Sequence, residues 1–245
     1  MGLFDLFKGG AKGGDGKASS AVQKYADTAT AKRAQTYERQ EAIGKLCDIG
    51  TVEAAAALLK RFTFQIDPSI TDQEEKETAF RGILAVGPEV LPAVRTFAQK
   101  AESLSWPMRV VKELVSEDDY VRELLAWLAR WDTEYAKFID PKLQILAALE
   151  DHKHGEIRAA VERFLEDVNE PARFHAVTAL FVQEDPAAAT SLARALAAEE
   201  SFRVKNKIVD GFASRGWLVP EDLRDVVASA LPPGAAMASD GALRR

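Results

Sequence analysis

The sequence has little cysteine and no long apolar run. Cys47 is the only cysteine in 245 residues, which rules out an internal disulfide. Its place in an apolar helical stretch predicts a buried small side chain. A single cysteine fits a reducing compartment, so we expect a cytoplasmic protein. No run of about 18 apolar residues occurs, and a membrane-spanning helix is therefore not expected.

The sequence also contains fewer Lys and Arg residues than Asp and Glu residues. The formal net charge is −6 and the sequence pI is about 5.3. A protein that binds nucleic acid over its whole surface needs many Lys and Arg side chains facing phosphates. We therefore expect no nucleic-acid partner, although a local basic patch is compatible with this balance.

The motifs of several enzyme classes are missing. The sequence contains neither the Gly-x-Ser-x-Gly of a nucleophile elbow nor the Gly-x-x-x-x-Gly-Lys-Ser/Thr of a phosphate-binding loop. His152 and His154 flank Lys153, but residues two apart on a helix face different sides, and Lys153 repels a cation. We expect a surface turn at these residues. The sequence thus predicts no metal, no cofactor and no catalytic activity.

What the sequence does contain is helical periodicity. From residue 31 to residue 231, apolar side chains recur at i, i+3, i+4 and i+7, and no alternating strand-like run is found. Ile157, Ala160, Val161 and Phe164 share one such stripe, which predicts that Phe164 packs between neighbouring hairpins. The predicted helices span residues 31–49, 51–62, 72–86, 88–101, 106–115, 118–131, 141–150, 154–166, 170–182, 186–199, 201–215 and 220–231.

Several breaks between these blocks carry helix-start chemistry. Thr71 with Glu74 reads as a capping box, and Asp185-Pro186 combines an N-cap residue with a proline at the first helical position. The acidic residues at the start of helix 72–86 favour the positive end of its dipole. The recurrence of helix pairs about every 30 residues predicts an array of stacked hairpins.

Two segments carry a resemblance to a known family. Gly87-Pro88-Glu89-Val90-Leu91-Pro92-Ala93-Val94 and Glu156-Ile157-Arg158-Ala159-Ala160-Val161 resemble HEAT repeats, which belong to the armadillo-type folds. The resemblance implies an all-α protein, a right-handed α-solenoid of about six HEAT-like hairpins whose stacked units line a concave binding face. Pro92, inside its helix, should bend that helix.

The two ends of the chain are expected to be flexible, unlike the helical segment 31–231. Residues 1–30 form an expected flexible segment in which a glycine-rich linker follows a short apolar head, too short for a secretory signal. We expect the head to attach the protein to a partner, to make weak peripheral membrane contact or to have no role. Residues 232–245 are an expected flexible tail. The head consists of Leu3, Phe4, Leu6 and Phe7.

A basic strip is the candidate binding site. Arg203, Lys205 and Lys207 lie on helix 201–215, and Arg173 and His175 lie on helix 170–182. If both helices line the concave face, these side chains present positive charge to a partner. The alternative is a solvated face of a charged helix.

These features favour a non-catalytic scaffold or adaptor that binds a protein or peptide partner. The resemblance leaves two alternatives open, a HEAT-like DNA-binding or DNA-repair glycosylase and a HEAT-like chromophore lyase. A continuous basic groove would favour DNA, whereas a groove of divided charge would favour a protein.

Overall fold

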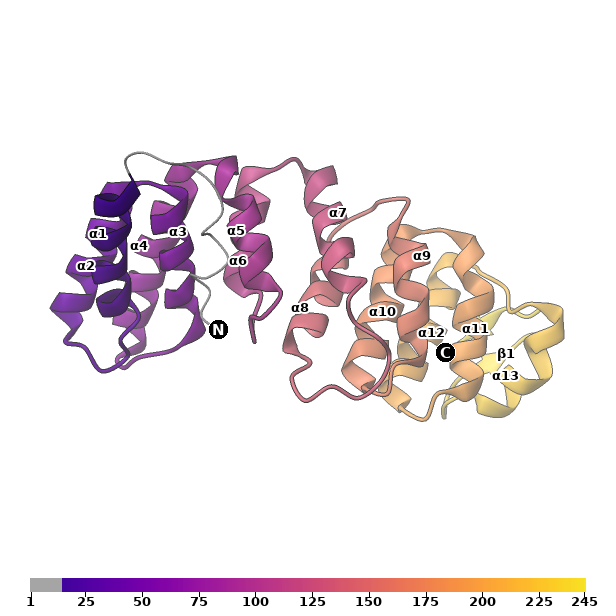
Figure 1. The fold of residues 1–245 in the computed structure, drawn as a ribbon. Helices are drawn as coiled ribbons and strands as arrows, with labels where there is room; N and C mark the ends of the chain where they lie inside the picture. Colours follow the sequence, from indigo (N-terminus) through magenta and orange to yellow (C-terminus); the bar gives the residue numbers. More distant parts are fainter. Residues whose placement is uncertain (1–14) are drawn as a thin grey trace. The chain divides into compact units, whose positions relative to one another are not determined.

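The protein is mostly helical, as the periodicity predicts. The structure, a computed structural model, describes residues 15–245, and about 70% of the chain is helix with little strand (Figure 1). Among the described residues no helix is long and apolar enough to cross a membrane. The α-helices are α1 (Asp15–Ala29), α2 (Thr36–Ile49), α3 (Val52–Leu59), α4 (Ser69–Val86), α5 (Leu91–Ala98), α6 (Ser105–Leu114), α7 (Glu117–Leu128), α8 (Asp140–Leu149), α9 (Ile157–Val161), α10 (Glu170–Gln183), α11 (Ala189–Ala198), α12 (Phe202–Arg215) and α13 (Arg224–Ala230).

Short 3₁₀ turns extend or introduce several of these helices. They account for most of the difference between the predicted and observed helix ends, because a 3₁₀ turn carries the same apolar spacing over a few residues. The turns are η2 (Lys60–Thr63), η3 (Pro88–Val90), η4 (Glu162–Glu166), η5 (Pro186–Ala188) and η6 (Glu221–Leu223).

The chain divides into two compact units. Unit 1 comprises the residues up to 100 together with 109–114, and unit 2 comprises residues 101–108 and 115–245. The division falls inside the segment 31–231 that the sequence presents as one repeat domain.

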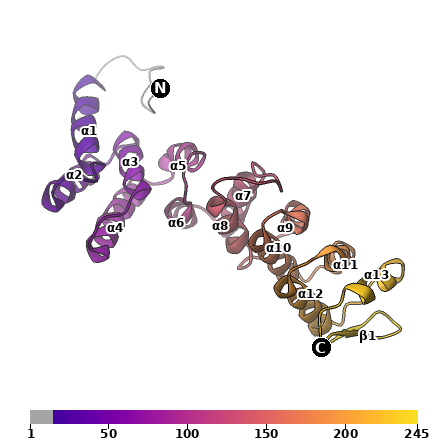
Figure 2. The ribbon, with the colours of Figure 1, turned by 90° about the horizontal axis from the view of Figure 1, so that it is seen from below.

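In unit 1, α1 packs against α2 and α3, while α4 lies beside the same two helices (Figure 2). Gly82 permits the approach of α4 to α2, since a Cβ atom there would lie 2.3 Å from the Sγ atom of Cys47. Cys47 is half-buried rather than buried. Burial, with a contribution from Asp48, raises the pKa of the thiol.

The helix α1 corrects the expectation of a flexible segment for residues 15–29 of the range 1–30. Its residues Val22, Ala26 and Ala29 are buried against the neighbouring helices. The expected attachment residues Leu3, Phe4, Leu6 and Phe7 lie outside the described residues.

In unit 2, α10 lies between α8 and α12, and α11 contacts both α12 and α13 (Figure 2). Gly211 allows α12 to pack closely on α10, because a Cβ atom would meet the ring of Phe181 at 2.2 Å. Trp217 packs against Phe181 and Phe212 with ring centroids 5.6 and 6.0 Å apart. Successive helices in this unit are therefore held by tight, largely apolar contacts.

The C-terminal segment 232–245 forms a small hairpin, not the flexible tail expected from the sequence. Strand β1 (Ala236–Met237) pairs antiparallel with β2 (Leu243–Arg244), and β2 contacts α12. Arg224 donates hydrogen bonds to the backbone carbonyls of Ser239 and Asp240. Leu243 is buried. The hairpin thus covers part of α12 that would otherwise face solvent.

Of the two predicted helix-start motifs, one is confirmed and the other is wrong, and the predicted bend at Pro92 is also wrong. Asp185 does cap the turn that Pro186 begins, accepting a hydrogen bond of 3.0 Å from the Ala187 amide. Thr71, however, is the third residue of α4, so the predicted capping box is wrong. Pro92 does not bend a helix interior, since it occupies the first turn of α5, where no intrahelical bond is lost.

Candidate functional site

Two of the five predicted strip residues come together around an aromatic ring. Arg203 and Lys207, both on α12, flank Phe174 of α10. The guanidinium carbon of Arg203 lies 3.6 Å from the centroid of the Phe174 ring, and Nζ of Lys207 lies 5.7 Å from it. Arg203 also pairs with Glu170 at 3.2 Å. Cations at these distances are attracted by the ring face.

The other three strip residues have separate partners. Arg173 makes a bidentate pair with Glu199, with N–O distances of 2.7 and 2.8 Å. His175 hydrogen-bonds Glu150 at 2.6 Å, and Lys205 donates to the backbone carbonyl of Ala230 at 2.8 Å. Arg203 keeps a 55% exposed side chain despite its pair with Glu170, and Lys207 lies on the same side of α12, so these two cations are the ones that a partner can reach. We call Phe174, Arg203 and Lys207 the α10–α12 face.

A repeated interaction links α8, α10 and α12. Lys142 of α8 pairs with Asp167 at 2.6 Å, and both side chains are completely buried. Arg173 also lies in the first turn of its helix, α10, and pairs with Glu199. Lys205 follows on α12, where a backbone carbonyl takes the place of the carboxylate. Lys142 and Arg173 thus bond the carboxylates that lie just before α10 and α12. Lys205 bonds the last residue of α13.

The two carboxylates of this series also accept a hydrogen bond from the residue just before each following helix. Asp167 accepts a hydrogen bond of 2.8 Å from the Asn169 amide, and Glu199 accepts one of 2.8 Å from the Ser201 amide. Asn169 and Ser201 are the N-cap residues of α10 and α12. Each carboxylate therefore bonds both a cation of the preceding helix and the residue that leads into the following helix.

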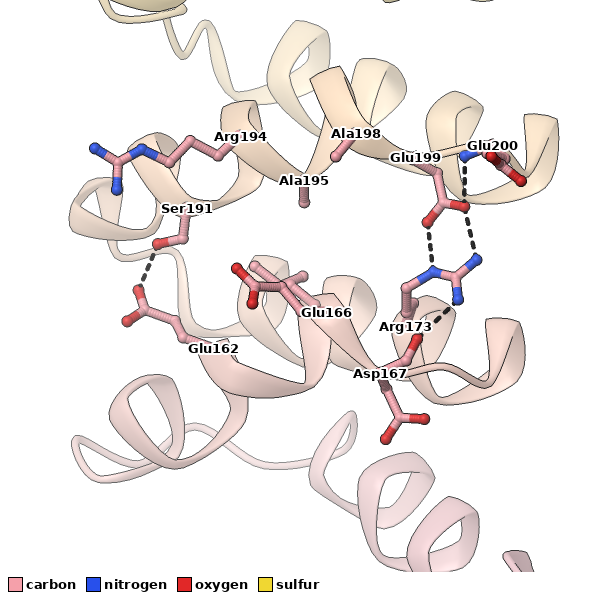
Figure 3. A pocket seen from close by; sticks show the side chains of 11 residues that line it. Glu162, Glu166, Asp167, Arg173, Ser191, Arg194, Ala195, Ala198, Glu199 and Glu200 are labelled. Carbon is pink, nitrogen blue, oxygen red and sulfur yellow. Dashed lines mark hydrogen bonds and ion pairs between the residues drawn. The ribbon is translucent and has the colours of Figure 1, made fainter. Parts of the chain in front are cut away.

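A cavity of about 560 Å³ opens beside the Arg173–Glu199 pair, between η4 and α11 (Figure 3). Its apolar lining includes Leu165, Ala195 and Ala198. The polar lining is dominated by carboxylates, for only the guanidinium groups of Arg173 and Arg194 oppose them. This acidic hollow does not extend the positive charge of the α10–α12 face. The lining carboxylates are Glu162, Glu166, Asp167, Glu199 and Glu200.

The pKa values of both Arg173 and Glu199 are shifted from their ordinary values. Burial acts to raise the pKa of Glu199, but hydrogen bonds from Arg173 and from the Ser201 amide outweigh it and lower the pKa below the ordinary value. The hydrogen bonds that Arg173 donates to Glu199 in turn raise the pKa of Arg173. Both shifts favour the charged pair.

We expect Glu199→Gln to make the protein less sensitive to acid. A carboxyl group whose pKa is lower in the folded state stabilises the fold above its unfolded pKa of about 4.3, and this stabilisation is lost as the pH falls through the folded pKa. The variant should be less stable than the parent at pH 7, and the difference should shrink between about pH 5 and pH 3. Urea denaturation across this range tests the expectation, and a constant difference would contradict it.

A second cluster of charges lies in the interior of unit 1, where the sequence indicates only acids at a helix start. Glu75 of α4 accepts hydrogen bonds from Arg39 at 2.8 Å and from Arg61 at 2.7 Å. Asp72 accepts from Arg61 and Lys76, each at 2.7 Å. All five side chains are buried. Burial acts to raise the pKa of Asp72, but the bonds from Lys76 and Arg61 lower it overall.

The histidines near the α8–α9 turn have carboxylate partners on α7. His152 lies 3.1 Å from Glu117 and His154 lies 2.9 Å from Asp118. Within residues 15–245 no group of three or more His, Cys, Asp or Glu side chains is arranged to hold a metal ion. These histidines therefore tie the turn to the start of α7.

Comparison with family models, with curated proteins and with solved structures found no match to this chain. The functional conclusion rests on the residues and contacts described above.

Proposed function

We propose that this protein is a non-catalytic scaffold or adaptor of the cytoplasm, built as a HEAT-like right-handed α-solenoid that binds a protein or peptide partner. The observation that carries the proposal is the series Lys142–Asp167, Arg173–Glu199 and Lys205–Ala230. A contact that recurs between successive helices is typical of a repeat array, in which each unit is stabilised by its neighbours. Such arrays use their exposed helix faces for binding.

The α10–α12 face supplies the chemistry for a partner. The side chain of Arg203 is 55% exposed although it contacts both Glu170 and Phe174. An Arg beside an aromatic ring combines a charged hydrogen-bond donor with an apolar surface, a combination that is enriched at the centre of protein interfaces. A partner segment with carboxylates and an apolar side chain would fit this face.

The surrounding charges favour a protein over nucleic acid. Glu150, Glu170 and Glu199 each contact one of the five predicted strip residues, His175, Arg203 and Arg173 respectively. A continuous row of unpaired cations, which phosphate backbones require, is therefore interrupted on α10 and α12.

The double variant Arg203→Glu/Lys207→Glu should slow partner association. A partner is first isolated from the native cell by affinity purification, with the full chain and with a chain that lacks residues 1–16 as bait. The association rate of the purified partner with the parent protein and with the variant is then measured. Exposed charges mainly steer the encounter, so the effect should be strongest at low salt and should fade as screening rises.

A matched control for this experiment is Lys100→Glu/Arg130→Glu, which reverses two exposed cations outside the α10–α12 face. It should leave the association rate close to that of the parent protein. If both double variants slow association equally, the effect reflects net charge alone. An unchanged rate for Arg203→Glu/Lys207→Glu would remove the proposed binding face.

A further inference from the structure

Four large apolar side chains are exposed on the segments that lead into α8, α10 and α12. Tyr135 and Phe138 precede α8 and are 80% and 51% exposed. Val168 precedes α10 and is 54% exposed, and Phe202, the first residue of α12, is 61% exposed. Single exposed apolar residues are common, whereas a group of them on adjoining segments is typical of an interaction site. We call these four residues the apolar edge of unit 2.

Hydrogen bonds hold the three segments side by side. The Val168 amide donates to the Thr133 carbonyl at 3.0 Å, which joins the segment before α10 to the segment before α8. The Ser201 hydroxyl donates to the Glu170 carboxylate at 3.1 Å, which places the start of α12 beside the start of α10. The apolar edge therefore extends over three adjoining segments of one compact unit. These segments are residues 132–140, 166–170 and 199–203.

The same segments carry an excess of negative charge. Lys137 and Arg203 are their cations, and Arg203 pairs with Glu170. Acids near a helix start favour the positive end of its dipole, but this does not account for the exposed aromatic rings beside them. A partner segment with Lys or Arg side chains meets charge of the opposite sign here. Within residues 15–245, the exposed carboxylates of these segments that form no ion pair are Asp132, Glu134, Asp140, Glu166 and Glu200.

Two of these carboxylates, Glu166 and Glu200, also line the cavity of about 560 Å³ between η4 and α11. The guanidinium group of Arg173 is held by Glu199. Figure 3 shows the guanidinium group of Arg194 directed away from the Glu166 carboxylate. The apolar lining of the cavity suits the methylene stem of a lysine, whose ammonium group then reaches the carboxylates. The cavity thus extends the apolar edge with a place for a cationic side chain.

We propose that the apolar edge of unit 2 binds a basic amphipathic segment of a partner protein. The apolar side chains of that segment pack on the apolar edge, and its cations meet the unpaired carboxylates, one of them in the cavity. The proposal rests on the proposed scaffold function in that it gives the partner a second surface, opposite in charge to the α10–α12 face. Its test uses a defined peptide in place of the native partner, so either surface can fail without the other.

The test is a fluorescence-anisotropy titration of the full chain with a labelled amphipathic peptide of leucine and lysine at low salt. One comparison peptide has glutamate in place of lysine, and another has serine in place of leucine. Both should bind about tenfold more weakly or worse, because each lacks either the charge or the apolar face that the edge requires.

Tyr135→Ala/Phe202→Ala should weaken binding of the leucine–lysine peptide about tenfold or more, since two exposed apolar contacts are lost. The matched control is Tyr37→Ala/Ile70→Ala, which removes two exposed apolar side chains of unit 1. It should leave the affinity close to that of the parent protein. Circular dichroism of each variant checks that the fold is retained.

Glu166→Gln/Glu200→Gln should weaken the same peptide about threefold or more at low salt, and the loss should shrink as salt rises. Its matched control is Glu41→Gln/Glu113→Gln, which neutralises two exposed carboxylates of unit 1 and should leave the affinity unchanged. A chain with a reversed α10–α12 face should bind the peptide no more weakly than the parent, which separates the two surfaces.

Absence of binding by the leucine–lysine peptide overturns the proposal, as does equal binding of the peptide with glutamate. Equal losses in the edge variants and their unit 1 controls would also overturn it. Sedimentation velocity covers the remaining occupant. If the parent protein self-associates and Tyr135→Ala/Phe202→Ala is monomeric, the apolar edge contacts a second copy of this chain and not a basic partner segment.

Discussion

Arg61→Met should lower the free energy of unfolding by about 3–5 kcal/mol, because it breaks a buried ion pair by removing one partner. Arg61 is fully buried and reaches Asp72 and Glu75, each at 2.7 Å. Its guanidinium group also stacks on Phe64, with the carbon 4.4 Å from the ring centroid. Methionine keeps most of the volume but leaves two buried carboxylates with fewer donors. The loss therefore reports on charge and not on packing.

Urea denaturation followed by far-UV circular dichroism measures this effect. The control is Lys45→Met, which removes an exposed lysine 3.9 Å from Asp48 and should cost less than about 0.5 kcal/mol. If Arg61→Met costs less than about 1 kcal/mol, the cluster does not behave as a desolvated network.

The helical character of the protein could be predicted because large apolar side chains mark one face of each helix. Val121, Leu124 and Leu128 follow the i, i+3 and i+7 spacing of the predicted helix 118–131, and all three are buried on α7. The helix α1 was not predicted, since its buried positions beyond Val22, among residues 20–29 whose burial is described, are the alanines Ala26 and Ala29. Alanine carries too little hydrophobic signal to separate a packed face from a solvated one.

The C-terminal hairpin could not be predicted for a different reason. Strands β1 and β2 contain two residues each, so no alternation can develop within them. Their position is fixed instead by tertiary contacts, such as the 2.9 Å hydrogen bond from the Val219 amide to the Gly241 carbonyl.

The candidate binding face was predictable only in part. Arg203 and Lys207 are four residues apart and lie on one side of a helix, whereas Lys205 is two residues from each and faces elsewhere. Helical spacing alone could have separated them. Phe174 gave no such signal, because its contact with both cations joins α10 to α12 and depends on how the two helices pack.

The buried cluster of unit 1 was hidden by the same limitation. Arg39, Arg61 and Asp72 are far apart in the sequence, and each looks like a residue of a solvated helix face. Their common burial arises only when α2, α3 and α4 come together. Sequence periodicity records which residues avoid water, but it does not reveal charges that satisfy one another inside the protein.

Phe164→Ala should lower the free energy of unfolding of unit 2 by about 3–5 kcal/mol, the usual cost of deleting a buried phenylalanine ring. Phe164 has no exposed surface, and its helical turn η4 packs on α10 and α11. All four tryptophans, Trp106, Trp127, Trp131 and Trp217, belong to unit 2, so tryptophan fluorescence during urea denaturation follows this unit. Phe202→Ala is the matched control, because that ring is 61% exposed and its loss should cost less than about 1 kcal/mol. Equal losses for the two variants would show that η4 does not carry the contact between neighbouring hairpins.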